Sequence, residues 1–256
     1  PDVKPPKKNF KALAPAEKDN EKPTITLAWN FGKSIADSSV NGCEVAMLYD
    51  LLLGSDSAPL RKALLKKFPD SAVSPLSGPA LNSFHVSFTL AFSEMQEEQK
   101  NEFKKTVFEV LRQLEKEGFP QNDVERALMD FEIRNLEVQR SSSGGPYSII
   151  ILRQVLRSWT YGMEPWKFVS KRKETEELKK SLADDKDYLK KLIKKYFIDN
   201  KEFSLGVIVP SVEYTEKRSR KENAIIKSLC KKTGINKIKE KLDAMDAWNL
   251  DNNLEL

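Results

Sequence analysis

With 256 residues, 39% of them hydrophobic and 9% aromatic, the chain has enough length and apolar content to bury a sizeable core. The 43 basic and 38 acidic residues nearly balance at a formal charge of +5, so most charges must pair or face water. The longest apolar run, near residues 148–152, is far below the roughly 20 residues that a membrane span needs, which excludes a membrane-spanning protein class.

The N-terminus lacks the charged start and apolar core of an export signal. Cys43 and Cys230 lie far apart without metal-ligand spacing, which excludes a disulfide framework and a zinc ribbon. We therefore expect two free thiols in a reducing compartment, which is the cytoplasm or, as the alternative, an organelle matrix. The start at Pro1 without an initiator methionine favours a processed protein or a piece of a longer one.

Residues 1–23 are rich in proline and in charged side chains, which predicts an extended tether between domains. Two later segments, 24–31 and 83–92, alternate bulky apolar residues with small or polar ones, the period of a strand with one buried face. A further apolar segment at 203–209 predicts a final strand that ends at Pro210. We interpret residues 24–210 as one domain.

Apolar residues at three- and four-residue spacing predict helices between these strands. The first helix is expected to have its cap at Asp37 or Ser38 and to end at Gly54. Further helices are expected at 59–68, 97–116, from the cap Asn122 to a break at Gly144, and at 147–159, 171–182 and 185–197. Residues 211–256 predict a helical linker segment whose narrow apolar side needs a partner surface.

This order of strands and helices has no βαβαβ rhythm, because the two kinds of element alternate in clusters. The predicted fold class is therefore α+β, with a mixed or antiparallel sheet and helices packed on one face.

Three short motifs follow one another along the chain: GSDSAPLRKAL at residues 54–64, EGF at 117–119 and WTYGMEP at 159–165. In this order and spacing they resemble the non-catalytic second domain of the presequence-protease branch of the pitrilysin (insulinase) zinc metallopeptidases. The resemblance covers roughly residues 24–210. One departure is the Phe-Pro-Asp turn at 68–70, where relatives tend to have glycine.

The resemblance implies a metalloprotease or processing-peptidase-like domain within a clam-shell peptidase of four similar domains, in which sheet faces line a closed chamber for unfolded peptides. Family catalysis depends on an H-x-x-E-H helix, and His85 is the one histidine of this chain. We therefore expect no catalytic residue and no metal ligand here, with zinc held elsewhere in the parent enzyme. The expected partners are the remaining domains of the same polypeptide and unfolded peptide substrates.

Small residues that allow close approach of a peptide backbone gather in two segments of the predicted domain. The resemblance implies that this edge holds the N-terminal part of a peptide substrate. The candidate substrate-binding residues are Gly54, Ser55, Ser57, Val73, Ser74 and Ser77. The alternative interpretation of the first segment is a plain helix start.

Other kinds of site are disfavoured by missing residues. Ser142 and Ser143 lack the G-x-S-x-G pattern and a second histidine, residues 54–59 lack a phosphate-binding pattern, and His85 lacks partner ligands for a metal. The basic residues of 211–241 suit nucleic acid, but their helical spacing favours an interdomain helix with a solvated charged side. The alternative function is a free-standing, non-catalytic binding or scaffold protein, associated with nucleic acid through this basic region.

Overall fold

The computed structural model describes residues 8–18, 20–34, 41–81, 85–136, 147–167, 169 and 172–251. The chain divides into two compact units. Unit 1 consists of Pro1–Ala12 and Lys22–Val209, and unit 2 of Leu13–Glu21 and Pro210–Leu256. The cap expected at Asp37 or Ser38 and the serines 142 and 143 lie outside the described residues.

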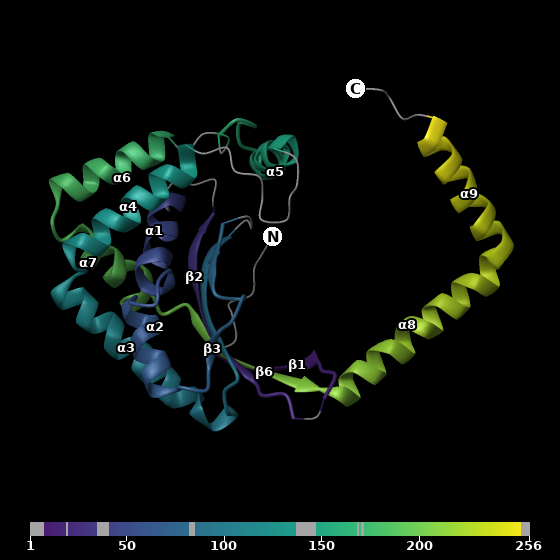
Figure 1. Cartoon of the computed structure of the whole chain (residues 1–256), viewed down its shortest axis with the longest axis horizontal. Coiled ribbons are helices and arrows are strands. Elements are labelled where there is room, and N and C mark those ends of the chain that lie inside the picture. Colours follow the sequence, from purple (N-terminus) through teal and green to yellow (C-terminus); the bar gives the residue numbers. More distant parts are fainter. Residues whose placement is uncertain are drawn as a thin grey trace. The chain divides into compact units, whose positions relative to one another are not determined.

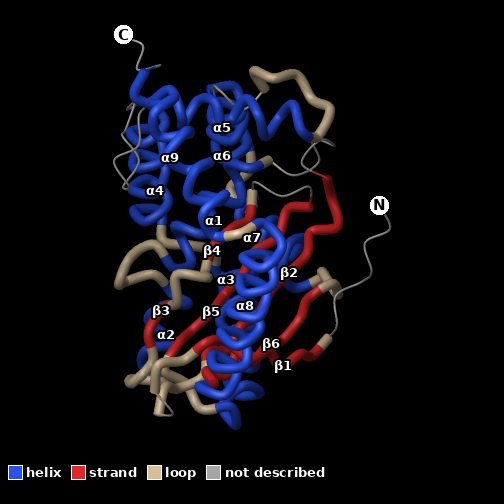
Figure 2. Tube along the Cα trace, turned by 90° about the vertical axis from the view of Figure 1, so that its right-hand side faces the viewer, coloured by secondary structure: helices blue, strands red, loops and turns tan. Residues whose placement is uncertain are grey.

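A sheet forms the centre of unit 1, with strands in the order β1, β6, β2, β5 and β3, and with β4 also paired to β5 (Figures 1 and 2). The pairings of β5 with β2, β3 and β4, and of β2 with β6, are antiparallel. The strands are β1 (Asn9–Pro15), β2 (Thr24–Ser34), β3 (Ala72–Val73), β4 (Gly78–Ala80), β5 (His85–Ser93) and β6 (Phe203–Ser211).

The two central strands confirm the period of two that the sequence predicts. Ile25, Leu27 and Trp29 of β2 are at most 1% exposed, as are Phe88 and its alternating neighbours on β5. Because successive strand residues point to opposite faces, the intervening small and polar residues form the other side of the sheet. The sheet therefore has one apolar face and one face of small and polar side chains.

Helices cover the apolar face. Figure 1 shows α1, α2, α3, α4, α6 and α7 on one side of the sheet, and both views place α5 beyond one end of it. The helices of unit 1 are α1 (Gly42–Leu53), α2 (Pro59–Lys67), α3 (Lys100–Glu117, after the short 3-10 helix Glu97–Gln99), α4 (Gln121–Leu136), α5 (Tyr147–Thr160), α6 (Arg172–Asp184) and α7 (Tyr188–Ile193, followed by the π-helix Lys194–Ile198). The predicted α+β class with helices on one face is confirmed.

Aromatic rings fill the space between this helix layer and the sheet. Trp29 and Phe88 both meet Phe197 edge to face, with 5.1 Å between ring centroids in each pair. The indole Nε1 of Trp29 donates a hydrogen bond of 3.2 Å to the carbonyl of Phe197, so the polar group of this buried ring is satisfied. The core thus connects the central strands to the π-helical turn after α7.

Several element boundaries differ from the sequence expectations. Helix α1 takes its N-cap from Asn41, whose Oδ1 accepts from the Cys43 N–H at 2.8 Å. Helix α4 starts at Gln121, one residue before the expected cap Asn122, and β6 continues through Pro210 to Ser211. The end expected at Gly54 is confirmed, because this residue caps the C-terminal end of α1.

Edge strand β1 lies within the segment for which the sequence predicts a tether. Its partner β6 contains Gly206, and a Cβ built on this glycine would lie 2.1 Å from the ring of Phe10. Because Gly206 has no side chain, the Phe10 ring can pack directly against the sheet. Sequence patterns missed β1, because Phe10 and Leu13 stand among prolines and charged residues.

Unit 2 contains two helices, α8 (Val212–Thr233) and α9 (Ile235–Asp251). The Oγ of Ser211 caps α8 by accepting from the Tyr214 N–H at 3.2 Å. Buried Ala16 is attached to the same helix, since Thr215 Oγ1 accepts from its N–H at 2.8 Å and donates to its carbonyl at 2.9 Å. Helical structure after residue 211 is as the sequence predicts.

Candidate functional site

The turn between α1 and α2 contains three of the candidate residues. The N–H of Gly54 closes α1 by donating to the Asp50 carbonyl at 2.9 Å, and a Cβ on Gly54 would lie 2.7 Å from that oxygen. The two serine hydroxyls, Ser55 and Ser57, are 3.1 Å apart and bond to each other. Glycine is thus required by a close backbone contact, and the serines form a small polar surface.

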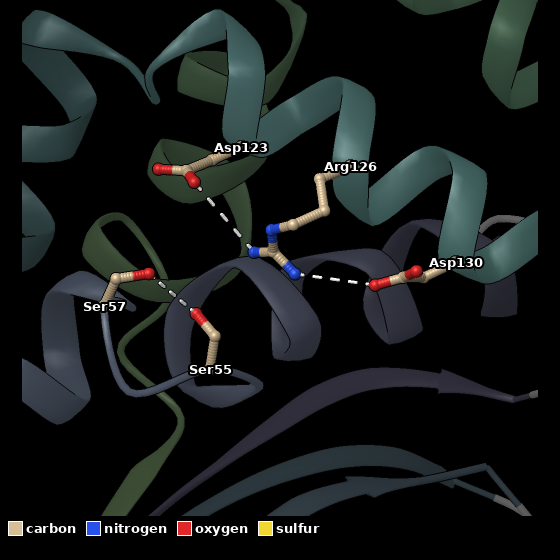
Figure 3. Close-up of polar contacts among 5 residues, drawn as sticks. All are labelled: Ser55, Ser57, Asp123, Arg126 and Asp130. Carbon is tan, nitrogen blue, oxygen red and sulfur yellow. Dashed lines mark hydrogen bonds and ion pairs between the residues drawn. The ribbon is translucent and has the colours of Figure 1, made fainter.

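The turn contains a charged side chain of its own, Asp56, which forms an ion pair with Arg61 of α2 at 2.8 Å. Figure 3 draws Ser55 and Ser57 together with Arg126 of α4, whose guanidinium pairs with Asp130 at 3.5 Å and Asp123 at 4.0 Å. Helices α1 and α4 are in contact, so the turn and this ion-pair group belong to one layer of the unit. Hydroxyls bonded only to each other have no base to activate them, which suits binding rather than nucleophilic catalysis.

The second candidate segment follows the outer edge of β5. Val73 pairs with Phe92 in the short strand β3, and the N–H of Ser74 donates to the Ala91 carbonyl at 2.9 Å. The hydroxyl of Ser77 both donates to that carbonyl at 2.8 Å and accepts from the Ala91 N–H at 2.9 Å. These serines therefore extend the sheet edge across the gap between β3 and β4.

The hydroxyls of this segment are committed to its own fold. Ser74 is 6% exposed and its Oγ accepts from the Leu76 N–H at 3.3 Å, while Ser77 is occupied by Ala91 as described above. Any contact of this segment with a peptide would therefore use backbone atoms. Among the described hydrogen bonds, none joins this segment to the turn at 54–57, so the structure leaves the candidate residues in two separate groups.

His85 lies at the start of β5, paired across the sheet with Ser34, and is half-buried. Within the described ranges, no group of three or more histidine, cysteine, aspartate or glutamate side chains is placed to hold a metal ion. A catalytic zinc site needs three protein ligands, so the residues present here do not fit that metal. The described helices also include none that is both long and apolar enough to cross a membrane.

A polar cluster that sequence patterns missed lies inside the helix layer. Glu44, in the first turn of α1, accepts hydrogen bonds from the hydroxyls of Tyr188 and Tyr196, the latter at 3.0 Å. Burial, followed by the carboxylate of Glu44, raises the pKa of Tyr188 to about 12 and raises that of Tyr196 further. The sequence signal was available in principle, since a tyrosine on an apolar helix side usually needs a partner for its hydroxyl.

This cluster fixes the start of α1 against the segment after α6. Phe31 of β2 stacks on Tyr196 with 4.6 Å between ring centroids, which closes the cluster on its sheet side. Both hydroxyls donate to the Glu44 carboxylate and the pKa of each tyrosine is raised, so neither phenol is activated as a nucleophile. We therefore assign the cluster a structural role.

Sequence comparison connects the chain to a group of large proteins. It is 30% identical over 210 residues to Protein HypA of Clostridium perfringens, an alignment that covers 81% of this chain and 20% of that protein. It is 23% identical over 206 residues to the mitochondrial presequence protease of Yarrowia lipolytica, covering 79% of this chain and 20% of the protease. The chain thus spans about a fifth of the length of these relatives, and no model of a protein family matches it.

Solved structures share the fold. The inactive peptidase domain of a proposed zinc protease from Bordetella parapertussis superposes with a TM-score of 0.57 at 13% identity, covering 77% of this chain and 95% of that domain. A proposed M16-like peptidase from Alicyclobacillus acidocaldarius gives a TM-score of 0.51 at 13% identity, over 80% of this chain and 44% of the other. The expected resemblance is confirmed: the chain is similar in sequence to presequence proteases, and its fold is that of peptidase domains of the M16 (pitrilysin/insulinase) type.

Proposed function

We propose that this chain is one domain of a larger zinc metallopeptidase that degrades unfolded peptides, and that its sheet forms part of the wall of the substrate chamber. The observation that carries the proposal is the two-sided sheet, with helices on one face and small or polar side chains on the other. The similarity to presequence proteases over most of the chain supports the substrate class.

The face without helices has the chemistry that a chamber wall needs. Ala28 and Asn30 of β2 stand opposite Thr89 and Ser87 of β5, and all four are half-buried. Short polar side chains stay hydrated and offer no large apolar surface on which an unfolded peptide would be held. Such a wall lets peptides of many sequences move toward a catalytic centre elsewhere.

We assign the candidate residues to a peptide exosite of the parent enzyme. Gly54, Ser55 and Ser57 contribute a turn without bulky side chains. In the second segment, Ser74 and Ser77 hold the chain at the sheet edge, since the N–H and carbonyl of Ser74 and the N–H of Ser77 are bonded within the fold, and the backbone of Val73 offers groups for strand-like pairing. Backbone pairing is independent of peptide sequence, which suits a peptidase with many substrates. The committed hydroxyls of Ser74 and Ser77 support this backbone interpretation over a side-chain one.

Zinc would belong to another domain of the parent enzyme, because the donor set among the described residues of this chain does not fit it. Metal analysis and a peptidase assay on the chain alone test this part of the proposal. We expect neither tightly bound zinc nor cleavage, and one zinc per chain that is lost on His85→Ala would contradict the assignment. The relatives include a bacterial protein and mitochondrial proteases, so the proposal is compatible with the cytoplasm and with an organelle matrix.

Kinetics of the whole enzyme test the exosite. Ser57→Trp places bulk on the exposed turn, whereas Ser57→Ala removes the hydroxyl alone and serves as the matched control. We expect Ser57→Trp to raise KM for an unfolded peptide of about 20 residues, and to leave one of about 6 residues unaffected, since at ~3.3 Å per residue it spans only ~20 Å. If both peptides respond alike, the segment is only a helix start.

A further inference from the structure

Helix α5 exposes a stripe of large apolar side chains. Ile149, Leu152, Leu156 and Trp159 are 50%, 53%, 46% and 66% exposed, and they recur at intervals of three, four and three residues. That spacing places all four on one side of the helix. We call these four side chains the α5 stripe.

The opposite side of α5 is less exposed. Ser158 is fully buried, and its hydroxyl donates back to the Gln154 carbonyl at 3.3 Å. Ile151 and Val155, which share that side, are half-buried. Exposure of large apolar side chains on α5 is therefore concentrated in the α5 stripe.

Charge on the helix is of one sign. Arg153 and Arg157 are the ionisable groups among residues 148–160, and the helix has no acidic residue. Arg153 is exposed and stands between Leu152 and Leu156 in the sequence, at the border of the α5 stripe. A complementary surface would be apolar in the middle and would present a carboxylate at that border.

We propose that the α5 stripe is a docking surface for a further domain of the same polypeptide, which presents an apolar patch bordered by a carboxylate. The inference rests on the proposed function, in which this chain is one domain of a longer protein. The relatives are about five times as long as the aligned region, so a covering domain has ample chain to come from. Exposed tryptophan beside arginine is typical of the residues that dominate interface energies.

A second copy of this chain is a poorer occupant on grounds of charge. Arg153 lies at the border of the α5 stripe, about halfway along its length, so a two-fold symmetric pairing of α5 with itself about that point would bring the two copies of Arg153 together. The helix has no carboxylate to offset that repulsion. The complement must therefore come from a different surface.

Hydroxyl-radical footprinting of the whole protein and of this chain alone tests the proposal. We expect oxidation of Trp159 to fall by about tenfold in the whole protein, because the centre of an interface is dry. Met129, which is 64% exposed on α4, is the control and should react similarly in both samples. Equal reactivity of Trp159 in both samples would overturn the proposal.

Two matched substitutions add a second readout. Trp159→Lys and Met129→Lys both change exposed side chains, so the isolated chain should melt as the wild type does in each case. In the whole protein, only Trp159→Lys should uncouple the domains, seen as an additional thermal transition and a new protease-sensitive site. A single unchanged transition in the Trp159→Lys protein would count against docking.

The outcomes separate this inference from the proposed function. Protection of Trp159 in a whole protein that degrades no peptides would keep the docking surface and reject the peptidase role. If the whole protein degrades peptides while Trp159 is as reactive as in the isolated chain, the peptidase role is kept and the docking surface is rejected. Protection that appears only at high concentration of the isolated chain, or only after peptide is added, would assign the surface to a second copy or to substrate and overturn the proposal.

Discussion

Helices α3 and α8 have similar amphipathic sequences but differ in what their apolar sides contact. On α3, Phe103, Val107 and Leu111 are fully buried in the core of unit 1. On α8, Ile225 and Leu229 remain 60% and 54% exposed. Periodicity therefore identifies which side of a helix is apolar, whereas burial depends on a partner surface that the pattern does not specify.

The energetic consequence differs between the two helices. Burying a large apolar side chain contributes about 1.5–3 kcal/mol, so the apolar side of α3 stabilises its unit, while that of α8 contributes little in the structure of this chain. Stability of α8 must come from its cap, its helical propensity and ion pairs such as Arg218 with Glu222 at 2.8 Å.

The largest expected effect is on α3, the helix whose apolar side lies in the core. Phe103→Ala should lower the free energy of unfolding by about 3–5 kcal/mol, because it removes a fully buried ring that contacts Phe92 at 5.7 Å between centroids. Leu229→Ala on α8 is the matched substitution and should change it by less than about 0.5 kcal/mol. Urea denaturation measures both. Similar losses for the two variants would show that the α8 side is buried in solution.

A smaller effect is expected from the Glu44 cluster, a polar contact within the well-packed helix layer. Tyr196→Phe removes one of two hydroxyls that donate to this carboxylate and should cost about 1.5–3 kcal/mol, the usual range for hydrogen bonds to charged groups. Tyr214→Phe on α8 changes an exposed hydroxyl and is the control. Equal stability of the two variants in urea would mean that the cluster is dispensable.

The same cluster predicts a pH dependence. An unfolded tyrosine titrates near 10, whereas the pKa of Tyr188 is raised to about 12 in the folded chain. Between these values the folded state binds more protons, so the free energy of unfolding should fall as pH rises from about 10 to about 12. Tyr188→Phe should flatten this fall relative to the wild type in denaturation curves at several pH values. An identical slope in both proteins would remove Tyr188 as its cause.

Sequence patterns predicted the parts of the fold that depend on local periodicity. The central strands β2 and β5 and most helices follow from alternation or from three- and four-residue spacing. Strands β1, β3 and β4 were missed because their pairing is made by distant residues. Phe10 needs Gly206, and Ser77 needs Ala91, and neither relation has a local pattern.

In the candidate site, too, local patterns could be predicted and tertiary contacts could not. The sequence located small residues at 54–57 and 73–77, but it did not show that the hydroxyls of Ser74 and Ser77 are used by the fold itself. The Glu44 cluster was missed because its tyrosines were counted as apolar positions of a helix. Which polar groups satisfy each other depends on tertiary contacts, so it is the least predictable part of the site.

The smallest expected effect lies at the base of α8, where Thr215 is hydrogen-bonded to the backbone of Ala16 within unit 2. Thr215→Val leaves the buried N–H and carbonyl of Ala16 without their partner and should cost about 1 kcal/mol locally. Because unit 1 contains none of these groups, its own unfolding should stay unchanged. Hydrogen exchange in residues 13–18 should accelerate roughly fivefold for that loss, whereas Ser219→Ala, an exposed change on the same helix, should not alter it. Unchanged exchange in the Thr215→Val protein would mean that this segment is held by other contacts, and α8 would then lack a specific attachment at its base.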